Sequence, residues 1–429
     1  MFRMSVRFAG QLLIALVLVG AGSGDLLGGG VERFLEEIEM RNPALQSLRE
    51  GAEGTTHRYP QVTAWPDPTL MVGLRNVSLD DFTVGDEMMS SMGVLYTQMM
   101  PHADVLAGKG EVANRTVALS MGRVEVFSHA LREKAIRGLY ELAVVDETLR
   151  IVREKKSTLI TLLAMVEARY ASGKGAQSDI LRIQLAISSQ SARLRLVIAK
   201  RETVLAGLNA LRDRPADTPI FVGVVPYLQR ELLAEEIAKG VRGGNAQYAL
   251  GEQDVEMAQA KRDLALASYG PTMQMGFGYW NRGGLDPILQ AQVGWSLASR
   301  TEQRQDEAVL EAEAGVRQAE ATLAGLERTL LAQVAQELAK GEAALDLITL
   351  FDEGFVPQAE SAYWAVVASY EGGKTDILMV LDHLLKWEEF EIGRAERVKD
   401  WGAAIASLER LVGRALSPTH PRFYREVNE

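Results

Sequence analysis

The chain contains no cysteine, and this absence excludes several classes of protein. Disulfide scaffolds, cysteine zinc sites, thiol nucleophiles and anchors on a lipidated N-terminal cysteine all need the missing side chain. Proline is scarce as well, at 13 of 429 residues, and aromatic residues make up only 7%. Because 47% of the residues are apolar and 24% are charged, the composition is still that of an ordered protein.

Runs of basic residues are also missing. The 46 basic residues are outnumbered by 57 acidic ones, which gives a net charge of −11. Nucleic acid is therefore not an expected partner, since phosphate backbones attract clustered basic side chains. The sequence has no phosphate-binding loop, no Gly-x-Ser-x-Gly elbow and no His-Glu-x-x-His motif, and its five histidines are scattered. We predict neither an enzyme nor a bound cofactor.

Long hydrophobic runs are absent beyond the N-terminus. There, Arg3 and Arg7 precede the apolar run Leu12–Ala21, which is typical of a secretory signal. We predict that residues 1–24 are a signal peptide. The alternative is a single transmembrane helix, for which the run is short of the roughly 20 apolar residues that a bilayer requires. An exported chain without other spanning segments is either soluble or a β-barrel membrane protein.

The mature sequence is repeated once. A shift of 203 residues superimposes Asn42 on Asn245 and Pro68 on Pro271, and a shift of 200 superimposes Tyr170 on Tyr370. Such matches at turn and strand positions indicate an internal duplication. The predicted divisions are a first repeat at 25–213, a connecting equatorial segment at 214–244, a second repeat at 245–416 and a C-terminal tail at 417–429.

Each repeat contains one very long predicted helix, at about 105–172 and about 300–371. Both regions keep apolar residues in 4-3 spacing, broken in the first by Lys156, and each would reach about 100 Å. A glycine turn follows each helix, and shorter helices return at about 178–213 and 375–414. The residues of the two predicted tip turns are Gly173, Lys174, Gly373 and Lys374. The helices that open each repeat, at about 31–59 and 245–268, would stack end to end on the returning helices.

Four short strands are predicted beside the turns at Pro68 and Pro271. Each has about ten residues that alternate between apolar and polar, as strands with one apolar face do. Such alternation is typical of membrane barrels and also of soluble sandwiches. Four strands cannot close a barrel, because the smallest single-chain barrels have about eight. The sequence therefore predicts an oligomer that shares one barrel and continues it as a helical tube.

In its motif order the chain resembles the TolC family of outer-membrane efflux proteins. The resemblance covers nearly the whole mature chain and is carried by Asn42–Leu45, Pro66–Leu70, Tyr170–Gly173 with Asp179–Leu181, and Tyr370–Gly373 with Val380–Asp382. It implies a mainly α fold with a small β part, in which four strands per chain contribute to a trimeric 12-stranded β-barrel above a long α-helical barrel. It also implies a passive exit duct in the Gram-negative outer membrane. Such a duct would contact outer-membrane lipid, a periplasmic adaptor and an inner-membrane pump of the RND or ABC type.

The resemblance also indicates a channel gate near the periplasmic tips. It assigns Asp382 to the pore constriction and Tyr370 to the closed-gate hydrogen-bond network, with Asp376, Tyr170 and Asp179 as further gate candidates. Three symmetry-related carboxylates around a narrow axis would bind cations and repel one another. The chain departs from the family pattern at Met379 and Thr375, which leaves the gating details open. The alternative is that Tyr370 is a core residue and Asp382 a solvated acid.

The transported substrate also stays open between metal ions, drugs and proteins. Residues 76–82 and 88–94 are similar to the heavy-metal efflux branch, and weak candidates for soft-metal ligands are Met88, Met89, Met92 and His102. Methionine is equally common as filler in strands and loops, so no metal site is predicted. The rival to the channel hypothesis is a soluble periplasmic coiled-coil adaptor or structural protein, whose strands would form a sandwich.

Overall fold

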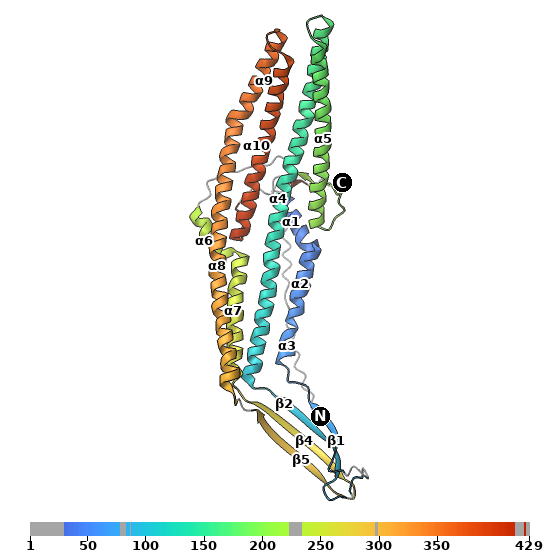
Figure 1. Cartoon of the computed structure of the whole chain (residues 1–429), viewed down its shortest axis with the longest axis vertical. Coiled ribbons are helices and arrows are strands. Elements are labelled where there is room, and N and C mark those ends of the chain that lie inside the picture. The colour runs from blue at the N-terminus through green and yellow to red at the C-terminus, as the bar shows by residue number, and fades with distance from the viewer. Residues whose placement is uncertain are drawn as a thin grey trace, which may run out of the picture.

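A computed structural model describes residues 30–77, 83–85, 87–222, 234–296, 299–416 and 424–425. The predicted signal peptide and most of the predicted tail lie outside these residues. The described chain is an elongated rod, with two helical hairpins at one end and a β-sheet at the other (Figure 1). The long helices therefore make up most of the rod, and the packing between elements is distributed along its length.

The elements of the first repeat are three short helices, two strands and a hairpin of long helices. In chain order they are α1 (Gly30–Arg41), α2 (Pro43–Thr56), α3 (Arg58–Thr63), β1 (Thr69–Arg75), β2 (Ser91–Met100), α4 (Ala103–Ala171) and α5 (Gln177–Leu211). The single opening helix predicted for this repeat is divided in three because Pro43 and Pro60 lack the amide hydrogen that an uninterrupted helix needs.

The second repeat follows a similar order, with two opening helices instead of three and one added irregularity. It comprises α6 (Ala234–Gly244), α7 (Ala246–Ala267), β4 (Thr272–Arg282), β5 (Leu285–Ser296), α8 (Thr301–Leu350), the π-helical turn η1 (Phe351–Phe355), α9 (Val356–Glu371) and α10 (Ile377–Val412). The first of these helices, α6, lies within the segment predicted to connect the repeats. The short strands β3 (Phe221–Val222) and β6 (Tyr424–Arg425) pair with each other. The long helix predicted at about 300–371 is present as α8, η1 and α9 without a gap, and the π-helical turn before Pro357 is its one irregularity.

Two asparagines hold the short helices in line with the returning ones. Asn42 and Asn245 cap α2 and α7 by accepting hydrogen bonds from Leu45 N at 3.1 Å and Tyr248 N at 2.8 Å. Their amide groups donate to the last turns of the other helices, Asn42 to Leu211 O at 2.8 Å and Asn245 to Leu411 O at 3.0 Å. The predicted end-to-end stacking is thereby confirmed, and each pair approaches the length of its long partner helix.

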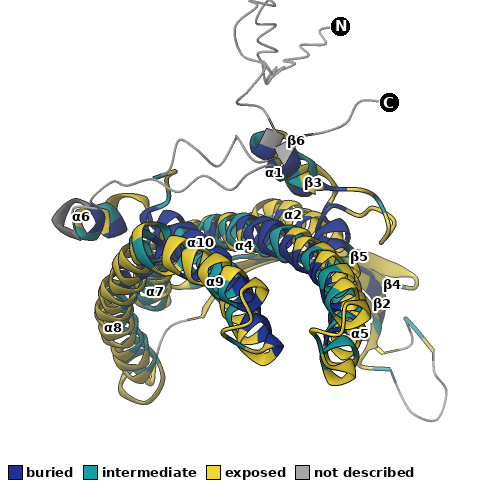
Figure 2. Ribbon diagram, turned by 90° about the horizontal axis from the view of Figure 1, so that it is seen from above, coloured by how far each residue is buried: buried dark blue, intermediate teal, exposed yellow. Residues whose placement is uncertain are grey.

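Viewed from above, the helices form an arc. The elements α1, α6, β3 and β6 lie on its convex side (Figure 2). The main apolar core lies midway along the rod, where α4 and α10 approach so closely that a Cβ on Gly402 would meet the buried ring of Tyr140. A second core, between the hairpins near their tips, includes Leu162, Tyr363 and Trp387. Among the described residues, no helix combines the length and apolarity that crossing a membrane requires.

The sheet is antiparallel throughout, in the order β1-β2-β4-β5, so β1 and β5 are its edges. Its register aligns the apolar residues of all four strands on one face: Leu70 pairs with Tyr96, Tyr96 with Phe277 and Phe277 with Ala291. Large side chains on this face are exposed, among them Val72 at 70% and Leu289 at 82%. The predicted alternation is confirmed, and its apolar side is turned outward instead of being buried in a sandwich.

Candidate functional site

The two hairpin tips have the same turn geometry. Gly173 and Gly373 adopt φ values of +73° and +70°, which glycine tolerates best. The amides of Lys174 and Lys374 donate to carbonyl oxygens five residues earlier, Lys174 to Arg169 O at 2.9 Å and Lys374 to Ser369 O at 3.0 Å. The tip turns predicted from the sequence are therefore present in both repeats.

Arg169 joins one tip to the other. Its Nη1 donates to the backbone oxygens of Tyr370 and Glu371, both at 2.7 Å. Its guanidinium also lies 4.8 Å from the centre of the Tyr370 ring. A cation at the last carbonyl groups of α9 is favoured by the helix dipole. Arg169 thus links α4 to the end of α9, and the sequence analysis did not identify it.

The predicted gate residues have different environments. Tyr370 is buried in the core between the hairpins, with the Asp179 carboxylate near its hydroxyl. Burial first, and the nearby Asp179 carboxylate second, raise the pKa of Tyr370. Tyr170 is 47% exposed and Asp382 is exposed on α10. The structure therefore brings Tyr370 and Asp179 together and leaves Tyr170 and Asp382 on the surface of the single chain.

Asp376 is the N-cap of α10. Its side chain accepts a hydrogen bond from the amide of Met379 at 3.0 Å, which satisfies one of the free donors at the helix start. The corresponding cap in the first repeat is Ala176, which makes no side-chain cap bond.

A buried polar cluster lies between the hairpins. Lys155 of α4 is fully buried, with its Nζ 2.7 Å from Glu391 Oε2 and 3.0 Å from the centre of the Trp387 ring. Glu388 of α10, also fully buried, accepts hydrogen bonds from the Gln190 amide at 2.5 Å and from Arg193 Nη1 at 2.8 Å. We call Lys155, Gln190, Arg193, Glu388 and Glu391 the inter-hairpin cluster.

No pattern in the sequence indicates this cluster as a whole. Glu388 is fully buried although its neighbour Glu389 is exposed. The charge that breaks the apolar stripe in the sequence is Lys156, whereas the neighbouring Lys155 is the buried residue. Burial raises the pKa of Glu388, while Arg193, Gln190 and Lys155 act in the opposite direction. The only indication in the sequence is a lysine within an apolar stripe, and this pattern does not indicate which acidic residue pairs with the lysine.

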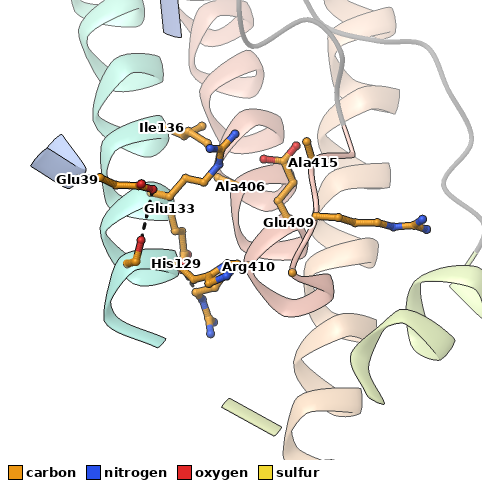
Figure 3. A pocket seen from close by; sticks show the side chains of 12 residues that line it. Glu39, His129, Glu133, Ile136, Ala406, Glu409, Arg410 and Ala415 are labelled. Atoms are coloured by element: carbon orange, nitrogen blue, oxygen red, sulfur yellow. Dashed lines mark hydrogen bonds and ion pairs between the residues drawn. The ribbon is translucent and has the colours of Figure 1, made fainter. Parts of the chain in front are cut away.

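A cavity of about 290 Å³ lies midway along the rod. Charged side chains from α1, α4 and α10 line it (Figure 3). Glu133 accepts hydrogen bonds from Ser407 at 2.8 Å and Arg410 at 2.5 Å, and Glu39 accepts one from Ser128 at 3.3 Å. The two bonds to Glu133 link α4 to α10 and so join the two repeats. We assign the cavity a structural role, because its acids are engaged with neighbouring donors.

The weak metal candidates do not form one site. Met88, Met89 and Met92 lie at the start of β2, and their side chains are 76%, 64% and 53% exposed. His102 follows the far end of β2, and its Nδ1 accepts a hydrogen bond from Asp104 N at 3.4 Å. The nine residues between Met92 and His102 span roughly 30 Å of mostly extended chain. Pro68 and Pro271 directly precede β1 and β4, as predicted.

Comparisons with known proteins bear on the fold. No family model matches the chain, and no curated protein sequence is similar to it. Solved structures do match over most of the chain. CusC has a TM-score of 0.76 at 14% identity, covering 93% of this chain and 96% of that one. The outer membrane protein VceC from Vibrio cholerae has a TM-score of 0.72 at 16% identity, covering 90% and 97%.

A third match is the outer membrane channel MtrE of Neisseria gonorrhoeae, solved in its open state. It has a TM-score of 0.73 at 15% identity and covers 90% of each chain. At such low identities the likeness concerns the fold. The chain has a TolC-like fold, mainly α with a small antiparallel sheet, as the resemblance implied. Function is argued below from the geometry.

Proposed function

We propose that this protein is a trimeric outer-membrane channel that serves as the passive exit duct of a tripartite efflux system. The observation that carries the proposal is the sheet at the end of the rod. It has a continuous apolar face that is exposed and two edge strands, β1 and β5, that bond to no further strand of the described chain. An exposed edge and an apolar face both favour association with other chains or lipid.

Three copies would satisfy these surfaces together. Joining β5 of one copy to β1 of the next three times would close a 12-stranded barrel and remove every sheet edge. The apolar face would then contact the hydrocarbon of the outer membrane. The helical arc supports the same symmetry, since three arcs side by side form a tube (Figure 2). Closed cyclic assembly of one chain is the commonest form of homo-oligomer.

The hairpin tips at the opposite end would face the periplasm. There the tube would be closed in its resting state, and the candidate gate residues are Tyr370, Asp179 and Asp382, with Tyr170 and Asp376 beside them. Support for this assignment comes from the proximity of Tyr370 to Asp179 and from the exposure of Asp382. A periplasmic adaptor and an inner-membrane pump of the RND or ABC type would supply the driving force, because the channel itself contains no motor.

Heavy-metal cations as the transported substrate have less support. The methionine and histidine residues that suggested them are separated along β2, and of the residues similar to that branch, 78–82 lie outside the described residues. We therefore propose the channel role without assigning a metal.

A planar-bilayer measurement tests the channel role. Protein purified in detergent from the membrane fraction should produce stepwise conductance, with units that stay constant from one insertion to the next. A periplasmic adaptor or structural rod would instead stay in the aqueous extract without detergent and produce no conductance. That result would reject the proposal.

A further inference from the structure

The second face of the sheet is the more polar one, and a fixed positive charge lies on it. The register puts Gly73, Gly93 and Trp280 in one row across β1, β2 and β4, with Arg75 two residues beyond Gly73 on the same side. Arg75 is the one charged residue of β1 and β2, while β4 ends at Arg282 and β5 has Asp286 near its start, so the charges of β4 and β5 cancel. The remaining polar side chains of this face are neutral, chiefly glutamine and threonine.

The position of Arg75 is determined by its neighbours. Its guanidinium carbon lies 3.5 Å from the centre of the Trp280 ring, a short cation–π contact. Its Nη1 donates to Gln290 Oε1 at 2.9 Å, and the same oxygen accepts a hydrogen bond from Trp280 Nε1 at 3.1 Å. Arg75 starts on one edge strand and Gln290 on the other, so the arginine side chain extends over the middle of the sheet.

Trp280 forms the platform for this charge. Its side chain is only 2% exposed, because the ring packs on a glycine floor and Arg75 covers it. A Cβ on Gly93 would come within 2.7 Å of the Trp280 ring and 2.1 Å of the Tyr279 carbonyl oxygen. A Cβ on Gly278 would lie 2.9 Å from Trp280 Nε1. Glycine at both positions therefore lets the ring lie flat and keeps the arginine above the polar face.

We propose that Arg75 forms a ring of three positive charges in the lumen of the channel, near its outer end, and that this ring favours anionic solutes over free cations. The inference rests on the proposed trimeric channel, in which the polar face lines the lumen. Arg75 is the last residue of β1, and β1 ends at the end of the sheet that is farther from the helices (Figure 1). The ring would therefore lie at the opposite end of the duct from the hairpin tips.

The dimensions make such a ring effective. Twelve strands about 4.8 Å apart and tilted by about 40° give a backbone radius of roughly 12 Å. Arginine side chains that extend inward would then hold their charges roughly 7 Å from the axis, which is less than the Debye length of about 10 Å at 0.1 M salt. Three such charges would lower the concentration of a monovalent cation on the axis by about fourfold and raise that of a monovalent anion by about fourfold. Rings of arginine or lysine are a known way to favour anions in pores.

Reversal potentials across a KCl gradient test the assignment in planar bilayers. Arg75→Gln should raise the ratio of K⁺ to Cl⁻ permeability by up to about sixteenfold at 0.1 M salt, and by less at 1 M, where screening is stronger. The matched control is Arg242→Gln, which removes the same charge from α6 on the convex side of the helical arc. The control should leave the ratio unchanged.

A second variant guards against failure to assemble. The chain has no cysteine, so Arg75→Cys can be modified selectively after insertion with a cationic or an anionic methanethiosulfonate reagent. The cationic reagent should restore anion preference, and the anionic one should increase cation preference beyond that of the unmodified cysteine. Equal permeability ratios in all three states would overturn the assignment of Arg75. Absence of any conductance from the unaltered protein would instead contradict the proposed channel itself.

Discussion

Substitution of Lys155 by methionine should weaken the contact between the two hairpins. In the structure the lysine is fully buried, paired with Glu391 at 2.7 Å and stacked on Trp387 at 3.0 Å. Methionine fills a similar volume but leaves Glu391 without its cation. Removing one partner of a buried pair costs about 3–5 kcal/mol, because the other charge stays uncompensated. The loss of the cation–π contact contributes to the same total.

If opening the gate separates the hairpins, this cost appears in the closed state alone. A loss of about 3 kcal/mol corresponds to a shift of roughly 150-fold toward the open state. Single-channel recording should therefore show a large rise in the open probability of Lys155→Met. The double variant Lys155→Met with Glu391→Met should recover most of the loss, since replacing both partners of a buried pair by apolar residues is often neutral.

Lys200→Met provides the matched control. Lys200 links α5 to α4 within one hairpin; its Nζ is 3.8 Å from Glu141, and both side chains are about half exposed. Such a surface pair contributes less than about 1 kcal/mol, so the open probability should barely change. The reasoning is refuted if Lys155→Met and Lys200→Met behave alike, or if the double variant is as open as the single one.

Three further predictions concern the pH response, the sheet and the tip. Burial raises the pKa of Glu388 above its usual 4.5, so the buried site between the hairpins binds a proton more tightly than a solvated glutamate does. Protonation therefore stabilises the closed state: the contact between the hairpins strengthens as pH falls through the raised pKa and weakens as pH rises above it. The open probability should therefore fall on acidification from pH 7, and Glu388→Gln should remove that dependence while Glu389→Gln keeps it. Gly93→Ala should reduce the yield of folded trimer, because its Cβ meets the Tyr279 carbonyl oxygen, whereas Gly294→Ala, where no neighbour lies within 4 Å, should assemble normally. Asp382→Ala should reduce block of the channel by divalent cations, and unchanged conductance and block would remove Asp382 from the constriction.

The extended architecture was predictable because its signals are local. The spacing of apolar residues defines the long helices, glycine ends them, and alternation defines the strands. Asn42 and Asn245 stood out through the repeat and are helix caps that also bond to another helix. These features depend on neighbours within a few residues or on the duplication itself.

The interior of the site depends on distant pairings and was not predictable. Lys155 and Glu391 are 236 positions apart in sequence, and no local pattern indicates that they meet. In β4, Trp280 continues the alternating positions of Gly276 and Gly278, so the sequence places all three on one face. Only the register of the strands reveals that the Trp280 ring lies under Arg75. The π-helical turn before Pro357 likewise reflects how α8 packs against α10, since Phe351 contacts Phe390 of that helix.

The mass of the membrane-extracted particle tests the central claim most directly. Native mass spectrometry of protein solubilised from the outer-membrane fraction should give a complex close to three times the mass of the processed chain, whose unprocessed form is 47.0 kDa. The same particle should produce stepwise conductance in bilayers. A monomer recovered from the aqueous periplasmic extract without detergent would contradict the account.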